Sequence, residues 1–454
     1  MAAGQMEYVE VPRAAAKERV LLADMRIEVS PRRWLVLAAF LLFCVSTNYQ
    51  WVQYTIVGDL VARYYRVPAA RVDWTSLVFM GALIALMLPV SFLLEKKGVG
   101  WSTKVGALLL AVGSWLKVAA VAPDRFLLAL AGQGLVGASQ VFQLGSPARL
   151  AAVWFPAPQL STACAIGVLG NEVGAAFGFL LSPLLVRPHD HPEDIGRDLS
   201  SSMLLTAGAS TVIFLLVVLL FKDKPKLPPN PMQAIERYTC TPVTLNDFFR
   251  SIGVLLTNRN YLLMLASCGI SGGALNVVGT ILNPIILRHF PDGQELAGRV
   301  GLVMMVSGIA GIALLGVLLD ITHRFQETAL GAFIVQTVAY AGFTFVLRDE
   351  NVILIYITVA FIGFSLFGYV TVAFELSAEV TYPVSESTMG CLLLIPANIL
   401  GFSMTMAFTW VLEHWGDLPA NILMIGCLTL GSILTIFVRK DYRRLAANTA
   451  PVKV

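Results

Sequence analysis

Residues 93–107, LLEKKGVGWSTKVGA, are matched 225 positions later by residues 318–332, LLDITHRFQETALGA. Leu, Glu/Asp, Thr, Gly and Ala positions are shared between the two stretches. An offset of about 227 residues also separates Pro156 from Pro383, Asn171 from Asn398 and Gly174 from Gly401. Chance similarity within apolar sequence is the alternative explanation. Because one offset holds across several segments, the sequence predicts two related halves that run in the same direction.

The composition places both halves in a membrane. The chain has 454 residues, of which 57% are hydrophobic and 13% charged, and its mean hydropathy is +0.73. Soluble chains carry roughly a quarter charged residues. The net charge of +3 comes from short basic clusters between apolar runs, which is typical of topology signals and not of a nucleic-acid surface. We therefore expect an integral membrane protein with no nucleic-acid partner.

Apolar runs of about the 20 residues that cross a hydrocarbon core occur in two groups of six. The predicted runs are 34–56, 75–94, 104–121, 126–147, 160–186 and 203–221, then 261–287, 299–319, 328–347, 352–374, 388–412 and 420–438. The sequence thus predicts an all-α membrane protein of about twelve transmembrane helices in two pseudo-symmetric six-helix bundles. The predicted division is a tail at 1–33, a bundle at 34–221, a linker at 222–260, a bundle at 261–438 and a tail at 439–454.

Basic residues predict the orientation. They flank the bundles on one side at Arg32, Arg33, Lys222, Lys224, Lys226, Arg439, Lys440, Arg443 and Arg444. By the positive-inside rule both termini and the linker are cytosolic, most simply in the plasma membrane. Arg63, Arg66 and Arg71 in the first outer loop oppose this assignment, but the even number of helices and the acidic loop 187–198 support it.

Several stretches resemble the feline leukaemia virus subgroup C receptor family of the major facilitator superfamily, over most of the membrane region. They are QWVQY at 50–54, VDW at 72–74, GSPAR at 145–149, STACA at 161–165, AGRVGL at 297–302, AFE at 373–375 and EVTYP at 379–383. Members of that family are described as choline, ethanolamine and haem transporters. The resemblance implies the major facilitator fold and transport of a small solute.

Trp51 is the first candidate for substrate binding, together with Gln50 and Tyr54 on the same predicted helix. A tryptophan face attracts a quaternary ammonium ion by about 0.5 to 2 kcal/mol. An aromatic anchor at the membrane interface is the alternative. Trp51 falls on the tryptophan that contacts the choline headgroup in the resembled family, which favours the binding role.

Glu172 is the second candidate, in the middle of the predicted helix 160–186 next to Asn171. An ionisable group at that depth is costly and usually faces a cavity or a partner. It can be a counter-charge for a cation, a proton-carrying group, or a protonated acid bonded to another helix. The resembled family usually has a glutamine here, so Glu172 implies a wider selectivity toward protonatable amines or proton coupling.

Two asparagines complete the candidate binding set. Asn276 stands where the resembled family has a tyrosine that closes an aromatic cage, and Asn398 stands where it usually has a glutamine. Asn398 also matches Asn171 in the internal repeat. Both asparagines can alternatively join helices by hydrogen bonds. These departures bring strict choline selectivity into question.

Charged residues at the inner helix ends are candidates for gating. Glu95 and Lys97 in EKKG at 95–98, echoed at Asp320, resemble the cytoplasmic gating motif of the superfamily. Arg149, with Glu375 and Glu379, can form a similar network between the halves. Charges of this kind bias which side is open, whereas solvated topology charges are the alternative.

No catalytic residue, metal site or cofactor is expected. The sequence contains no nucleotide-binding loop, nucleophile elbow or metal-binding cluster, so we expect no enzyme. Haem iron prefers His, Cys, Met or Tyr ligands, and all five histidines fall in loops or at predicted helix ends, at 189, 191, 289, 323 and 414.

The sequence and the resemblance together favour an alternating-access transporter of a small organic cation of the choline or ethanolamine kind, acting as a monomer in the lipid bilayer. Two alternatives stay open. One is haem transport by the same fold. The other is a receptor or sensor that has kept the fold but moves nothing.

Overall fold

The computed structural model describes residues 28–229, 245–291, 293–322, 324–349, 351–381 and 386–439. Twelve helical segments in this part of the chain are long and apolar enough to cross a membrane, which confirms the predicted fold class. Residues 1–27, His323 and the basic residues after Arg439 lie outside the described ranges, as does the side chain of Asp320.

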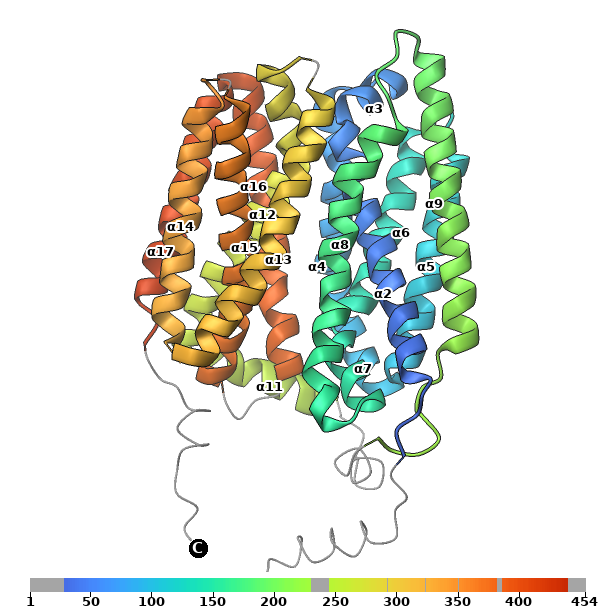
Figure 1. Ribbon diagram of the computed structural model, residues 1–454, viewed down its shortest axis with the longest axis vertical. Coiled ribbons are helices and arrows are strands. Elements are labelled where there is room, and N and C mark those ends of the chain that lie inside the picture. Colours follow the sequence, from blue (N-terminus) through green and yellow to red (C-terminus); the bar gives the residue numbers. More distant parts are fainter. Residues whose placement is uncertain are drawn as a thin grey trace, which may run out of the picture.

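The first half contains six of the spans. Its helices are α2 (Arg33–Val52) continued by η1 (Thr55–Val57) and α3 (Gly58–Tyr65), then α4 (Ala69–Lys97), α5 (Val99–Ala119), α6 (Phe126–Leu144), α8 (Leu160–Leu185) and α9 (Pro192–Leu220). The short helix α7 (Ser146–Trp154) and the 3-10 turn η2 (Ala157–Gln159) connect α6 to α8. We call the two ends of the molecule the α3 end and the α7 end (Figure 1).

The second half contains α12 (Arg259–His289), α13 (Gln294–Thr322), α14 (Phe325–Val346), α15 (Val352–Thr381), α16 (Glu386–Trp415) and α17 (Asp417–Ile436). Equivalent helices pack together in both halves: α2 on α8 corresponds to α12 on α16, and α4 on α6 corresponds to α13 on α15. This correspondence is what a repeated unit produces. Across the seam between the halves, α8 packs on α13 and α4 packs on α16.

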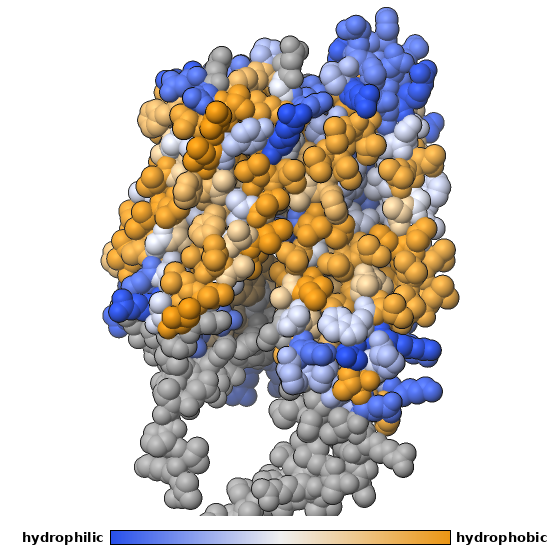
Figure 2. Space-filling view, in the orientation of Figure 1, coloured by the Kyte–Doolittle hydropathy of each residue, from blue (hydrophilic) through white to orange (hydrophobic). Residues whose placement is uncertain are grey.

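The surface matches a bilayer. On the face shown in Figure 2, a broad apolar band covers the middle of the molecule, and hydrophilic residues gather at its two ends. In addition, the amphipathic helix α11 (Leu245–Thr257) lies across the α7 end. It occupies part of the stretch that the sequence indicated only as a polar linker.

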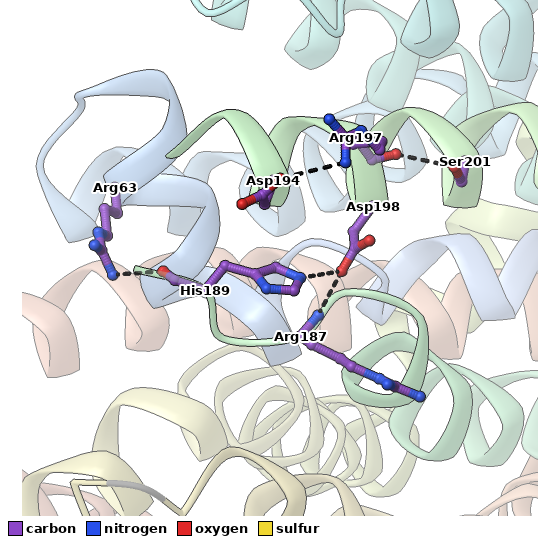
Figure 3. A network of polar contacts seen from close by, with 7 residues as sticks. All are labelled: Arg63, Arg187, His189, Asp194, Arg197, Asp198 and Ser201. Carbon is purple, nitrogen blue, oxygen red and sulfur yellow. Dashed lines mark hydrogen bonds and ion pairs between the residues drawn. The ribbon is translucent and has the colours of Figure 1, made fainter. Parts of the chain in front are cut away.

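The first helix is longer than its apolar run suggested. The predicted run ends at 56, whereas the span continues through α3 to Tyr65. At the α3 end, Arg63 donates to the carbonyl oxygen of His189 in the loop between α8 and α9 (Figure 3). It also donates to the carbonyl oxygen of Asp190 in the same loop. A hydrogen bond of 2.9 Å from His189 to Asp198 closes the same loop. Arg63 is therefore held by the acidic loop, which explains a basic residue on this side.

Glycines bring α8 close to α2. Gly170, Gly174 and Gly178 recur every four residues on one face of α8, and a side chain at Gly174 would overlap the α2 backbone at Val45. Lipid offers no hydrophobic drive for helix association, so close backbone packing of small residues takes its place.

We predict that Gly174→Leu destabilises the protein by several kcal/mol, because the added atoms have no space between α2 and α8. Thermal unfolding of the purified protein measures the effect. Gly208→Leu is the matched control, since nothing lies within 4 Å of a side chain at that position of α9. Equal melting temperatures for the two variants would contradict this account of the packing.

Candidate functional site

A break in the first helix lies beside the seam between the two halves. Helix α2 ends at Val52, and the chain passes through η1 before it resumes as α3. The Thr55 hydroxyl donates to the Val52 carbonyl oxygen at 3.2 Å, and a longer contact of 3.4 Å reaches the Gly279 carbonyl oxygen on α12. The break thus places the last turn of α2 against the second half.

Trp51 occupies that last turn and contacts both halves. Its indole N–H donates to the Ser76 hydroxyl on α4 at 3.2 Å, and Thr280 on α12 donates to the same hydroxyl at 2.8 Å. The far edge of the indole lies against Gly279, where a side chain would overlap the ring. Trp51 is 9% exposed, and its orientation is fixed by one hydrogen bond and one close contact.

Asn276 lies one helical turn from this contact. Residues three, four or seven positions apart lie on the same face of a helix. One face of α12 therefore carries Asn276, Gly279 and Asn283 along the seam. The Asn276 side chain donates to the Ala397 carbonyl oxygen of α16 at 3.3 Å and is half-buried. The structure therefore brings Asn276 to the same face as the Trp51 contact.

Gln50 and Tyr54 are not brought to the seam. The Gln50 amide bonds with the hydroxyls of Ser114 and Ser210 at 2.9 and 3.2 Å, inside the first bundle. The Tyr54 hydroxyl contacts the Met203 sulfur at 3.6 Å. Both side chains are completely buried, because successive residues of a helix point about 100° apart.

Asn171 is part of a polar cluster in the first bundle. Its side-chain oxygen accepts from Asn48 at 2.8 Å and from Gln143 at 3.0 Å. Gln140 in turn donates to the Asn48 side chain at 3.0 Å. The cluster connects α2, α6 and α8, and Asn171 remains half-buried at its edge.

Glu172 lies on a different face of α8. Phe179 packs against Gly298 and Gly301 of α13, and Glu172 precedes Phe179 by seven residues, which is two helical turns. That spacing places Glu172 along the contact between α8 and α13, at the seam. It is half-buried, and no described residue forms an ion pair with it.

Asn398 also lies along the seam. It shares a face of α16 with Phe402, which packs on Trp74 of α4, and with Thr409, which bonds to Asp73 of α4. Its side chain donates to the Leu394 carbonyl oxygen of its own helix at 3.0 Å. Trp51, Glu172, Asn276 and Asn398 therefore gather on seam faces, one on each of α2, α8, α12 and α16.

Hydrogen bonds fasten the halves together at the α3 end. Asn283 donates to Asp59 at 3.0 Å, and Thr409 donates to Asp73 at 2.8 Å. We call these two bonds the latch. Four direct hydrogen bonds between the halves lie at the level of Trp51 or closer to the α3 end, and a hydrogen bond between Cys391 and Ser91 joins α16 to α4 nearer the α7 end. The latch borders a pocket of about 190 Å³ whose wall also contains Glu413 and Arg288.

The residues expected to gate lie at the α7 end. Glu95 and Lys97 stand in the last turn of α4, and Arg149 on α7 is close enough to act on the Glu95 carboxylate. Glu375 and Glu379 are in the last two turns of α15, where Glu379 is buried. The first three belong to one half and the two glutamates to the other, so they flank the seam opposite the latch.

Lys117 was missed by the sequence reasoning. It lies on α5, is completely buried, and donates to the side-chain oxygens of Gln53 at 2.9 Å and Gln133 at 3.4 Å. Gln133 also donates to the Gln50 carbonyl oxygen at 2.8 Å, next to Trp51. The available signal was a single lysine in an apolar run, which is rare inside a membrane.

The described histidines lie at loops and helix ends: His189 and His191 beside α9, His289 at the end of α12 and His414 near the end of α16. A hydrogen bond of 3.3 Å links His289 to Asp417, and His414 stacks on Trp410. Within the described ranges, no group of three or more His, Cys, Asp and Glu side chains is arranged to hold a metal ion.

Comparison with known proteins gives the family. The model of the Major Facilitator Superfamily matches residues 35–389. The zebrafish (Danio rerio) choline/ethanolamine transporter flvcr2a is 37% identical over 92% of this chain and 88% of its own. The human (Homo sapiens) choline/ethanolamine transporter FLVCR2 is 35% identical over 93% of this chain and 80% of its own. The chain belongs to the feline leukaemia virus subgroup C receptor family of the major facilitator superfamily.

Solved structures of distant members agree with this family's fold. A bacterial homologue of the lysosomal transporter Spinster, in an inward-facing conformation, superposes with a TM-score of 0.68 at 12% identity, over 92% of this chain and 99% of its own. The fucose transporter FucP in the outward conformation gives 0.63 at 15% identity, over 90% and 98%. The chain is thus a multi-pass membrane transporter related to choline/ethanolamine transporters, and its family is not one of enzymes.

Proposed function

We propose that this protein is an alternating-access transporter of a small organic cation of the choline or ethanolamine kind. The observation that carries the proposal is the position of Trp51, whose indole stands at the seam and touches both halves. A substrate bound there contacts both halves at once, so its binding is coupled to their relative movement. The relatives named above, described as choline/ethanolamine transporters, support this substrate class.

The surroundings of Trp51 suit a cation. The indole face attracts ammonium groups, and its edge is held by Ser76 and Gly279, so little ordering is needed on binding. Glu172, when ionised, provides a negative charge along the same seam. At the α3 end Asp59, Asp73 and Glu413 line the pocket beside the latch, which favours the approach of a cation from that side.

Asn276 and Glu172 set the proposed selectivity. Asn276 offers amide donor and acceptor atoms where the family usually has an aromatic ring, so one cation-binding face is absent. A primary ammonium group donates three hydrogen bonds, which Glu172 and Asn276 can accept, whereas a quaternary ammonium donates none. We therefore propose that ethanolamine-type amines are transported relatively better here than by relatives that carry the aromatic residue.

The proposed orientation places the α7 end in the cytosol and the α3 end outside, most simply across the plasma membrane. Arg32, Lys222, Lys224 and Lys226 lie at the α7 end, as the positive-inside rule requires of a cytosolic face. Labelling of intact cells tests this: a cysteine introduced at Lys226 should resist an impermeant thiol reagent, and efficient labelling from outside would reverse the orientation.

For Trp51, we predict that Trp51→Ala weakens choline binding about tenfold, since the lost cation attraction is about 0.5 to 2 kcal/mol. Trp51→Phe should be milder, because a smaller aromatic face remains. Uptake of labelled choline into vesicles with equal amounts of reconstituted protein gives the measurement. Trp115→Ala is the control, because Trp115 is an exposed tryptophan on the outer surface of α5.

Unchanged choline affinity in both Trp51 variants would contradict the binding role and favour an aromatic anchor at the membrane interface. Uptake of labelled haem, measured in the same vesicles, distinguishes haem transport from choline transport. Uptake of haem without uptake of choline would contradict our proposal. Binding of choline without any flux would instead favour a receptor or sensor.

For Glu172, we predict that choline transport weakens as the pH falls, because protonation of the carboxylate removes the charge that attracts the cation. Glu172→Gln should flatten this dependence while the protein still folds, since glutamine has nearly the same size and carries no charge. Glu193→Gln, at an exposed position near the start of α9, should keep the wild-type profile. Identical pH profiles and substrate preferences for wild type and Glu172→Gln would make Glu172 a structural group.

A further inference from the structure

A basic pocket of about 570 Å³ lies at the α7 end of the first half, away from the seam. Its wall is formed by residues 28–32, which lead into α2, and by residues 222–227, which follow α9. Trp154, the last residue of α7, completes the wall. Three separate segments of the chain therefore meet around one space, within the size range of small-molecule sites.

Backbone contacts hold these segments together. The Glu28 N–H donates to the Pro228 carbonyl oxygen at 3.2 Å, which ties the entry to α2 to the chain after α9. The Asp223 carboxylate packs on Gly100 in the first turn of α5, where the helix dipole favours a negative group. With Asp223 fixed there, Lys222, Lys224 and Lys226 all face the pocket.

The pocket has a large excess of positive charge. Arg32 and the three lysines line it, against a single carboxylate, Glu28. No ion pair with a described residue neutralises any of these four cations. Arg33 is not part of the wall: its guanidinium packs on Trp34 and Phe155 and donates to the Gln159 side chain and the Ser30 carbonyl oxygen. All four cationic side chains of the wall are exposed, so solvent screens their mutual repulsion, and an anion bound among them would reduce it further.

Trp154 adds an unused hydrogen-bond donor. The residue is 2% exposed, and its indole N–H has no acceptor among the described residues. A buried donor without an acceptor costs about 1 to 3 kcal/mol, and an acceptor bound in the pocket regains this energy only if the Trp154 ring moves enough to expose its N–H. Basic residues at this end could be explained by solubility or membrane topology alone. A buried indole N–H beside them is not explained in that way.

We propose that this pocket binds a phosphorylated polyanion, such as the headgroup of a phosphoinositide or the free inositol phosphate of the same structure. Phosphate oxygens accept hydrogen bonds from the ammonium and guanidinium groups and from the indole N–H. Basic pockets beside the cytosolic ends of membrane helices bind such headgroups. The site is separate from the seam and does not depend on which solute the protein transports.

The test uses the purified full-length chain. Binding is measured to vesicles of phosphatidylcholine with and without a phosphatidylinositol bisphosphate, and separately to soluble inositol trisphosphate. The triple variant Lys222→Gln/Lys224→Gln/Lys226→Gln should weaken binding roughly a hundredfold, about fivefold for each lysine. Trp154→Phe, which removes the donor but keeps a ring, should weaken binding severalfold.

A matched control removes the same charge from the same end of the other half: Arg250→Gln/Arg259→Gln/Arg439→Gln should keep nearly wild-type affinity. Binding to the vesicles alone identifies the ligand as a lipid, and binding to both probes shows that the phosphorylated headgroup suffices. The proposal would be overturned if the protein bound neither the vesicles nor the inositol trisphosphate. It would also be overturned if both triple variants lost the same amount of binding affinity. Thermal unfolding of each variant confirms that it is folded.

Discussion

The absence of water in the hydrocarbon core is the constraint on which this structure depends. Backbone groups there can be satisfied only within helices, and helices associate through close packing and side-chain hydrogen bonds. The glycines of α8, at Gly174 and its neighbours, provide the close packing. The polar clusters around Asn171 and Lys117 provide the side-chain hydrogen bonds. These contacts hold the helices of the first half together.

The contact between the halves is of a different kind. It combines the glycine-lined contact of α8 with α13 and a few hydrogen bonds concentrated toward the α3 end. Individual hydrogen bonds contribute only about 0.5 to 1.5 kcal/mol net, so the latch can open without disturbing either half. Trp51 lies next to the latch, on the side that faces the middle of the molecule. A ligand at this tryptophan can therefore change the balance between closed and open arrangements by its differential affinity alone.

The helix number, their grouping and the repeat could be predicted because twenty-residue apolar runs and a fixed offset are properties of the sequence itself. The side-chain directions could not. Gln50 and Tyr54 stand within one turn of Trp51, yet of these three residues only Trp51 reaches the seam. A helix covered by protein on one side and lipid on the other is apolar all round, so its hydropathy does not show which face points where. The break after Val52 and the partners of Lys117 depend on other helices. Glu172 became a candidate because an ionisable group in an apolar run is noticeable without a structure, and Asn276 because the resembled family has a tyrosine there.

We propose that the two halves move about the seam and that the latch holds the α3 end closed. Spin labels on cysteines introduced at Asp124 and Arg348, exposed at the α3 end of each half, report the separation by pulsed electron resonance. We expect one short distance for the latched protein, and a second, longer distance whose share grows with choline and with Asn283→Ala, which removes one latch bond. A single unchanged distance under all these conditions would contradict the account.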